Sequence, residues 1–193
     1  MILYCIVTAF LNVLGGVVLG LSVFLKDPGQ RQNQLFSWFT VSFTGWSFFY
    51  LLWQFAQTPE EALVYTRLLL GFSTFIPITY YHFVSRLTGQ GNDLEIRIGY
   101  IVAMVIAAFT PTPYLVNHVE PELMFPFWPK GGPVFYPYIL HFGYFTVRSW
   151  MALFAVFRKS SHGRRNQLGY VIFCTVAGWI GGLTNFLLWF DIP

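Results

Sequence analysis

A few polar side chains lie inside long apolar stretches of this chain, where unpaired polar groups are costly. Arg148 stands nine residues before the end of one such stretch at Phe157, roughly 13 Å by helical rise. Its side chain cannot span that distance to water, so it must face protein, water or a bound group. His141, Tyr144 and Arg148 follow one another at i, i+3 and i+7, which places them on one helical face.

Several interpretations of these residues remain open. With no acidic residue expected at its depth, Arg148 either bonds to backbone and hydroxyl groups or binds an anionic ligand or lipid headgroup. His82 either packs in the core or titrates near neutral pH as a switch. Trp128, in the apolar segment Met124–Pro133, either anchors a loop folded back at the membrane interface or forms a lid over a pocket. The candidate ligand-binding residues are therefore His141, Tyr144, Arg148, His82 and Trp128.

Other kinds of chemistry lack the residues they need. No Asp or Glu occurs inside an apolar stretch, which disfavours a proton pump or a cation-coupled carrier. Zinc-protease, phosphate-loop and nucleophile-elbow spacings do not occur in the sequence. His82 and His141 are expected at different depths, which disfavours a haem held between them. We therefore expect no catalytic residue, no metal, no cofactor and no enzyme activity in this chain.

The elements that position the candidate residues are six apolar stretches of bilayer length. The 193 residues are 55% hydrophobic and 10% charged, too few charges to cover the surface of a soluble domain. The stretches are continuously apolar rather than alternating, so they predict helices and not the strands of a barrel. We expect an all-α polytopic membrane helix bundle, one domain over residues 1–193, with spans at Ile2–Leu25, Leu35–Phe55, Ala62–Leu87, Ile98–Val116, Phe135–Phe157 and Leu168–Phe190.

The charges of the connections alternate along the chain. The first, third and fifth connections are basic, whereas the second and fourth are rich in glutamate. Because Lys and Arg stay on the cytoplasmic side, this predicts an N-terminus outside and basic loops inside a cell membrane, with a prokaryotic inner or plasma membrane favoured. An even number of spans places both termini outside. The net charge of +3 suits an anionic inner leaflet, and no nucleic-acid partner is expected.

Local signals predict details of helix ends and packing. Thr58-Pro59-Glu60-Glu61 resembles a helix-capping sequence that opens the third span, and Pro111 and Pro113 are expected to end the fourth. Gly16 and Gly20 form a small-xxx-small pattern, as do Gly178 and Gly182, and each packs helices either within the bundle or between subunits. Interhelical hydrogen bonds are expected from Asn12, Gln54, His141 and Asn185.

Several short motifs together resemble the N-terminal seven-transmembrane region of sensor histidine kinases. They are Asn12, the entry Asn33–Phe36, Trp46 with Tyr50, Pro77 through His82-Phe83, and the Gly-Gly and Asn185-Phe-Leu segment of the last span. The resemblance implies a sensory input module that signals to a cytoplasmic domain, in cis or in trans, within a two-component system, with a homodimer as one arrangement. A seventh span and kinase motifs are not in the sequence, so we expect a truncated input region or a stand-alone relative.

Two functions follow as hypotheses. In the first, the chain is a non-catalytic membrane sensor whose lipid- or ligand-dependent tilt carries the signal. In the second, it is a small transporter or a lipid- or anion-binding accessory subunit, in which Arg148 attracts an anion.

Overall fold

The chain folds into helices that lie side by side and alternate in direction. The computed structural model describes residues 2–189, except for the side chains of residues 180–188. Six helices occur in this part: α1 (Ile2–Lys26), α2 (Arg31–Trp53), α3 (Pro59–Thr88), α4 (Asp93–Ala108), α5 (Phe135–Phe157) and α6 (His162–Trp189). The predicted all-α bundle is confirmed, and α5 has the predicted bounds.

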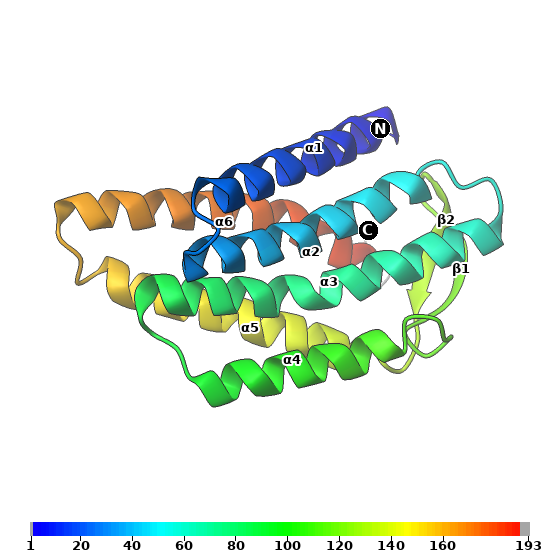
Figure 1. Cartoon of the computed structure of the whole chain (residues 1–193). Helices are drawn as coiled ribbons and strands as arrows, with labels where there is room; N and C mark the ends of the chain where they lie inside the picture. Colours follow the sequence, from blue (N-terminus) through cyan, green and yellow to red (C-terminus); the bar gives the residue numbers. More distant parts are fainter. Residues whose placement is uncertain (1, 190–193) are drawn as a thin grey trace.

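The ends of the bundle differ in charge. The connections α1–α2, α3–α4 and α5–α6 lie at one end, which we call the basic end because Lys26, Arg86, Arg158 and Lys159 stand beside them (Figure 1). The α2–α3 connection and a β-hairpin lie at the opposite end. The three connections that are basic in the sequence therefore also lie together at one end of the structure.

Helix α3 is the centre of the bundle and packs against α2, α4 and α5. Its first turn is capped as the sequence predicted: the Thr58 hydroxyl accepts a hydrogen bond from the Glu61 backbone at 3.2 Å. Gly89 ends the helix in the left-handed conformation, with φ of 70°, which glycine adopts without strain. The helix continues through Pro77, whose side chain is buried in the core.

Helix α1 packs against α2 through the small-xxx-small pattern. Gly16 lies against Thr44 and Gly20 against Thr40, so closely that a Cβ atom at either glycine would collide with the threonine hydroxyl. This pattern therefore joins helices within one chain, as one of the two interpretations held. At Gly178 on α6 an added Cβ atom would meet nothing within 4 Å, so no described neighbour depends on that glycine.

Replacing Gly16 with Leu is expected to lower the free energy of unfolding by about 1–3 kcal/mol, because the new side chain has no room beside Thr44. Gly15→Leu is the matched control. A Cβ at Gly15 meets nothing within 4 Å, so that variant should keep its stability or gain up to about 1 kcal/mol from helix propensity. Denaturation in mixed micelles, followed by circular dichroism, measures both; equal losses would contradict this packing.

The fourth helix begins and ends earlier than predicted. The sequence placed a span at Ile98–Val116, whereas α4 occupies Asp93–Ala108. The Asn92 side chain accepts a hydrogen bond from the Leu94 backbone at 2.9 Å and so starts the helix. Turns occupy the residues around Pro111 and Pro113, as expected from these two helix breakers. At 16 residues α4 is shorter than the other described helices.

A β-hairpin that the sequence did not predict covers the end opposite the basic end. Strand β1 (Val116–Glu122) pairs antiparallel with β2 (Phe125–Gly131). Arg67 of α3 fixes the start of β1, because its guanidinium donates two hydrogen bonds to the carbonyl of Val116 at 3.0 and 3.2 Å. The connection between α4 and α5 is thus folded back onto the bundle, as one interpretation expected, but as strands rather than as an irregular loop.

The outward faces of the helices are apolar. Leu3, Phe10, Leu14 and Leu25 on α1 all expose more than half of their surface. In the described part, four helices (α1, α2, α3 and α5) are long and apolar enough to cross a membrane. An apolar surface of this extent is stable in lipid rather than in water.

Candidate functional site

An ion pair joins Arg148 of α5 to Glu95 in the first turn of α4. The Arg148 Nε donates to Glu95 Oε1 at 2.7 Å, and Nη2 donates to Oε2 at 2.9 Å. This bidentate geometry adds both energy and directional specificity to the pairing of guanidinium and carboxylate groups. The Glu95 side chain is only 13% exposed and that of Arg148 is 36% exposed. The carboxylate is therefore mostly buried, whereas the guanidinium keeps about a third of its side chain exposed.

Two tyrosines complete the coordination of the carboxylate. Tyr144 of α5 donates to Glu95 Oε1 at 2.7 Å, and Tyr81 of α3 donates to Oε2 at 2.6 Å. The Arg148 guanidinium also lies over the Tyr81 ring, 5.9 Å from its centroid. We call Tyr81, Glu95, Tyr144 and Arg148 the Glu95 cluster. It joins three helices through one carboxylate, and four donors favour the charged form of that carboxylate.

The expectation that no acid would lie at the depth of Arg148 is wrong. It followed from placing Glu95 in a connection, three residues before the predicted span at Ile98. In the structure the Asn92 cap starts α4 early enough to bring Glu95 into its first turn. Asn followed by acidic residues is a helix-start signal, and it could have revealed the error. Tyr81 gave no such signal.

The three residues predicted on one face of α5 contact two different helices, α4 and α3. Tyr144 and Arg148 share Glu95, whereas His141 is buried and turns to α3, where its Nε2 lies 3.2 Å from the Thr74 carbonyl oxygen. His82 of α3 contacts neither Glu95 nor His141. It faces α4, where its Nδ1 lies 3.2 Å from the Tyr100 hydroxyl. Both histidines therefore occupy packed positions in the core.

Trp128 is part of an aromatic cluster at the hairpin. It is 2% exposed and packs against the rings of Trp53 and Phe125, with centroids 5.5 and 5.2 Å away. The Trp53 indole N–H donates to the Phe127 carbonyl at 2.8 Å, which ties α2 to β2. Trp128 thus packs the hairpin onto the helices, and it does not line the hollow at the basic end that is described below.

The expected interhelical hydrogen bonds are only partly formed. His141 makes one, as described, but the buried Gln54 Nε2 has no partner within residues 2–189. Asn12 is exposed on α1 and has none in the same range. The side chain of Asn185 lies outside the described residues.

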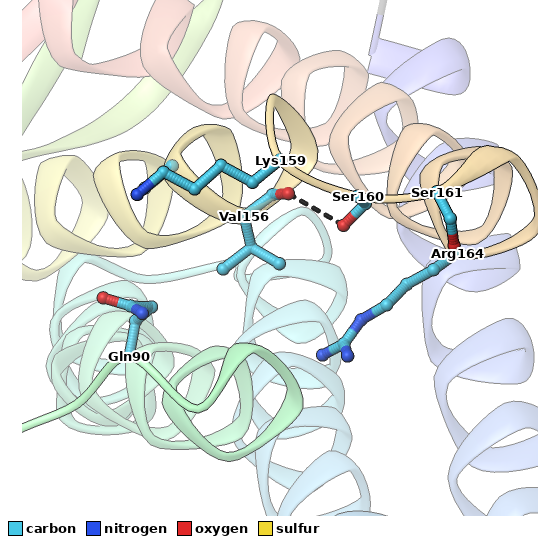
Figure 2. A pocket seen from close by; sticks show the side chains of 7 residues that line it. Gln90, Val156, Lys159, Ser160, Ser161 and Arg164 are labelled. Atoms are coloured by element: carbon cyan, nitrogen blue, oxygen red, sulfur yellow. Dashed lines mark hydrogen bonds between the residues drawn. The ribbon is translucent and has the colours of Figure 1, made fainter.

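An open hollow of about 420 Å³ lies at the basic end, between the α3–α4 connection and the start of α6. Figure 2 shows the Arg164 side chain reaching into it from α6, with Gln90 on the other side. Arg164 donates to the Leu87 carbonyl at 3.3 Å, and the Ser160 hydroxyl donates to the Val156 carbonyl at 2.8 Å. None of the five residues predicted as a ligand site lines this hollow.

Long apolar helices packed side by side define a multi-pass membrane helix bundle. Residues 7–192 match the family model of the N-terminal 7TM region of histidine kinase, and the chain belongs to this family. The resemblance inferred from short motifs is therefore confirmed. No curated protein and no solved structure matches the chain significantly.

Proposed function

We propose that this chain is the membrane-embedded sensory input module of a histidine-kinase-like signalling protein and is not itself catalytic. Its membership of the family of N-terminal 7TM regions carries the proposal. The signal passes to a cytoplasmic signalling domain, in cis or in trans, from a prokaryotic inner or plasma membrane. The geometry adds a specific element through which a stimulus can act, the Glu95 cluster.

The Glu95 cluster suits a switch because one carboxylate holds three helices. A stimulus that favours a different tilt of α4 must break two charge-assisted bonds and two tyrosine bonds together. Such a coupled set has two discrete arrangements, formed and broken, rather than a continuous range. A ligand or lipid shifts the balance to the extent that it binds one arrangement more tightly than the other.

The test is a chimera with a histidine kinase whose own input region belongs to the same family. Residues 1–193 replace its first six helices, and its last span and kinase core are kept. Glu95→Gln keeps the shape of the side chain but removes the charge that holds Arg148. We expect basal autophosphorylation in membrane vesicles to change about tenfold, which corresponds to about 1.4 kcal/mol between the two arrangements.

Asp93→Asn is the matched control. Asp93 also pairs with an arginine, Arg86, at 2.9 Å, but both side chains are about half exposed or more. That pair should contribute little, so the control should keep the parental phosphorylation rate. If both variants insert normally and phosphorylate at the parental rate, the cluster has no signalling role. If the parental chimera itself is inactive when folded, the input role fails.

The orientation is a separate part of the proposal, with the basic end in the cytoplasm. In a chain whose Cys5 and Cys174 are replaced by Ala, single cysteines at Gln57 and Ser161 mark the two ends; both positions are exposed. A membrane-impermeant maleimide should label Gln57→Cys in intact cells and Ser161→Cys only after permeabilisation. Labelling of Ser161→Cys in intact cells would reverse the orientation.

The pairing of Arg148 with Glu95 favours sensing over the transporter or anion-binding alternative. That hypothesis needed an Arg148 whose charge was available to an anion. The bidentate bond with Glu95 neutralises Arg148 and occupies its Nε and one terminal nitrogen. Sensing is thus the function that the geometry supports better.

A further inference from the structure

Among the described residues that line the hollow at the basic end, two are cations and none is acidic. Its volume of about 420 Å³ lies within the range of about 300–1,000 Å³ that small-molecule sites occupy. Most of its lining side chains donate hydrogen bonds, namely Gln90, Lys159, Ser160, Ser161 and Arg164. The hollow therefore offers positive charge together with several donors, which is the chemistry that binds an anion.

The two cations keep donors available for a ligand. Within residues 2–189 the Lys159 ammonium has neither a hydrogen bond nor an ion pair. Arg164 uses one terminal nitrogen, Nη2, to donate to the Leu87 carbonyl of α3 at 3.3 Å, and its side chain extends into the hollow (Figure 2). The Nε and Nη1 groups of Arg164 have no partner in the same range. The bond to α3 thus positions the guanidinium and leaves part of it unoccupied.

The positive charge around the hollow is not neutralised by neighbouring acids. No Asp or Glu occurs in the sequence between Glu122 and Asp191, so the α5–α6 connection has no acid of its own. Across the hollow, the acid at the start of α4, Asp93, is already paired with Arg86 at 2.9 Å. Helix α6 also begins beside the hollow, after Ser161, and a helix N-terminus carries a partial positive charge. The site therefore suits a counter-ion from outside the chain.

We propose that this hollow binds a phosphate group, held between Lys159 and Arg164. A phosphate presents several acceptor oxygens at once. A guanidinium binds two of them with its planar fork, and a lysine ammonium adds a compact point charge. This inference goes beyond the proposed sensory role and does not rest on it.

The position of the hollow favours a phospholipid as the source of the phosphate. The hollow lies where α5, which is long and apolar enough to cross a membrane, ends at Phe157, and this is the level of the lipid headgroups. Ala155 lines the hollow, and Met151, one turn earlier on the same face of α5, is 56% exposed. Acyl chains can follow this apolar face while the headgroup occupies the hollow. Basic pockets between membrane helices bind anionic headgroups in this way.

Native mass spectrometry of the full chain, in uncharged micelles that contain dioleoylphosphatidylglycerol, tests the site by counting the lipids that the chain retains. Dioleoylphosphatidylcholine should be retained about tenfold less, because the cations repel its choline group. Lys159→Gln and Arg164→Gln should each lower retention of phosphatidylglycerol about three- to tenfold, the effect of losing one charge-assisted hydrogen bond near water. Lys159→Arg keeps the charge and should retain the lipid.

Arg158→Gln is the matched control, because it removes the same charge from the same connection at an exposed residue that does not line the hollow. It should retain phosphatidylglycerol as the parent chain does. An equal loss in all three glutamine variants, or no retention by the parent chain, would overturn the inference.

Competition with inorganic phosphate distinguishes the two sources of the phosphate group, with sodium chloride at the same ionic strength as the reference. Lipid that stays bound in millimolar phosphate identifies a phospholipid site, in which the acyl chains contribute. Displacement by phosphate, and not by chloride, identifies a site for phosphate groups in solution. Either result supports the phosphate site, whereas equal displacement by chloride would contradict it.

Discussion

Replacing Glu95 with Ala is expected to lower the free energy of unfolding by about 2–4 kcal/mol, among the largest effects of any single substitution. The change leaves the Arg148 cation and two tyrosine hydroxyls without their acceptor, and of these only the Tyr81 side chain is fully buried. Breaking one side of a buried pair is costly because the other charge remains uncompensated. Arg148 retains 36% exposure of its side chain, and we therefore expect less than the full cost for a wholly buried pair.

A double-mutant cycle separates the pair from its parts. Arg148→Met removes the cation and keeps an apolar side chain of similar length, so the double variant of Glu95 and Arg148 should lose less stability than the sum of the two single changes. Asp93→Ala serves as the control, because its exposed pair with Arg86 should contribute at most about 1 kcal/mol. Equal losses for Glu95→Ala and Asp93→Ala would show that the Glu95 cluster adds nothing to stability.

Replacing Trp53 with Ala is expected to cost about 3–5 kcal/mol, the usual range for removing a large buried ring. Trp53 is 6% exposed, stacks on Phe125 with centroids 5.2 Å apart, and holds the Phe127 carbonyl of β2. The loss should appear in denaturation followed by circular dichroism and as faster proteolysis of the hairpin.

Two further variants separate the contribution of the Trp53 hydrogen bond from that of its buried ring. Trp53→Phe keeps an aromatic ring but loses the hydrogen bond to the hairpin, and should cost about 1–2 kcal/mol. Trp38→Ala removes the same residue type from the same helix, but Trp38 is 62% exposed and should matter little. A loss at Trp38 as large as that at Trp53 would mean that the hairpin contact is not the source.

The class of the fold was predictable because lipid imposes a simple constraint on sequence. A continuous apolar run of bilayer length must be a helix, and Phe135–Phe157 was predicted to the residue for this reason. The capped start of α3 was equally clear, since Thr58 and Glu61 stand at the required spacing. Both features depend only on residues that are close together in the sequence, so the sequence alone is enough to predict them.

The Glu95 cluster was not predictable to the same extent. The position of Glu95 depends on where α4 begins, and apolar content alone set that start too late. The helical period placed His141 with Arg148, yet it does not state which neighbouring helix lies on each side of α5. That arrangement sends His141 to α3 and Arg148 to α4.

The amino-acid composition of the hairpin does not predict strands. Proline at positions 126 and 129 removes backbone donors from β2, and such residues argue against a strand. The pairing tolerates them, with irregular register between Val116 and His118 and between Glu120 and Glu122. Lys130 reaches both Glu120 and Glu122 at 3.2 Å, a tertiary detail that composition does not reveal.

The shortness of α4 has a consequence for the surrounding lipid. Sixteen residues rise about 24 Å, whereas the hydrocarbon core of a bilayer is about 30 Å thick. Where α4 crosses, the acyl chains beside it must compress, or the polar turn before it must sink below the headgroups. Each ångström of mismatch costs a fraction of a kcal/mol. In an α4 that crosses the bilayer, membrane thickness would therefore act directly on the helix that carries Glu95.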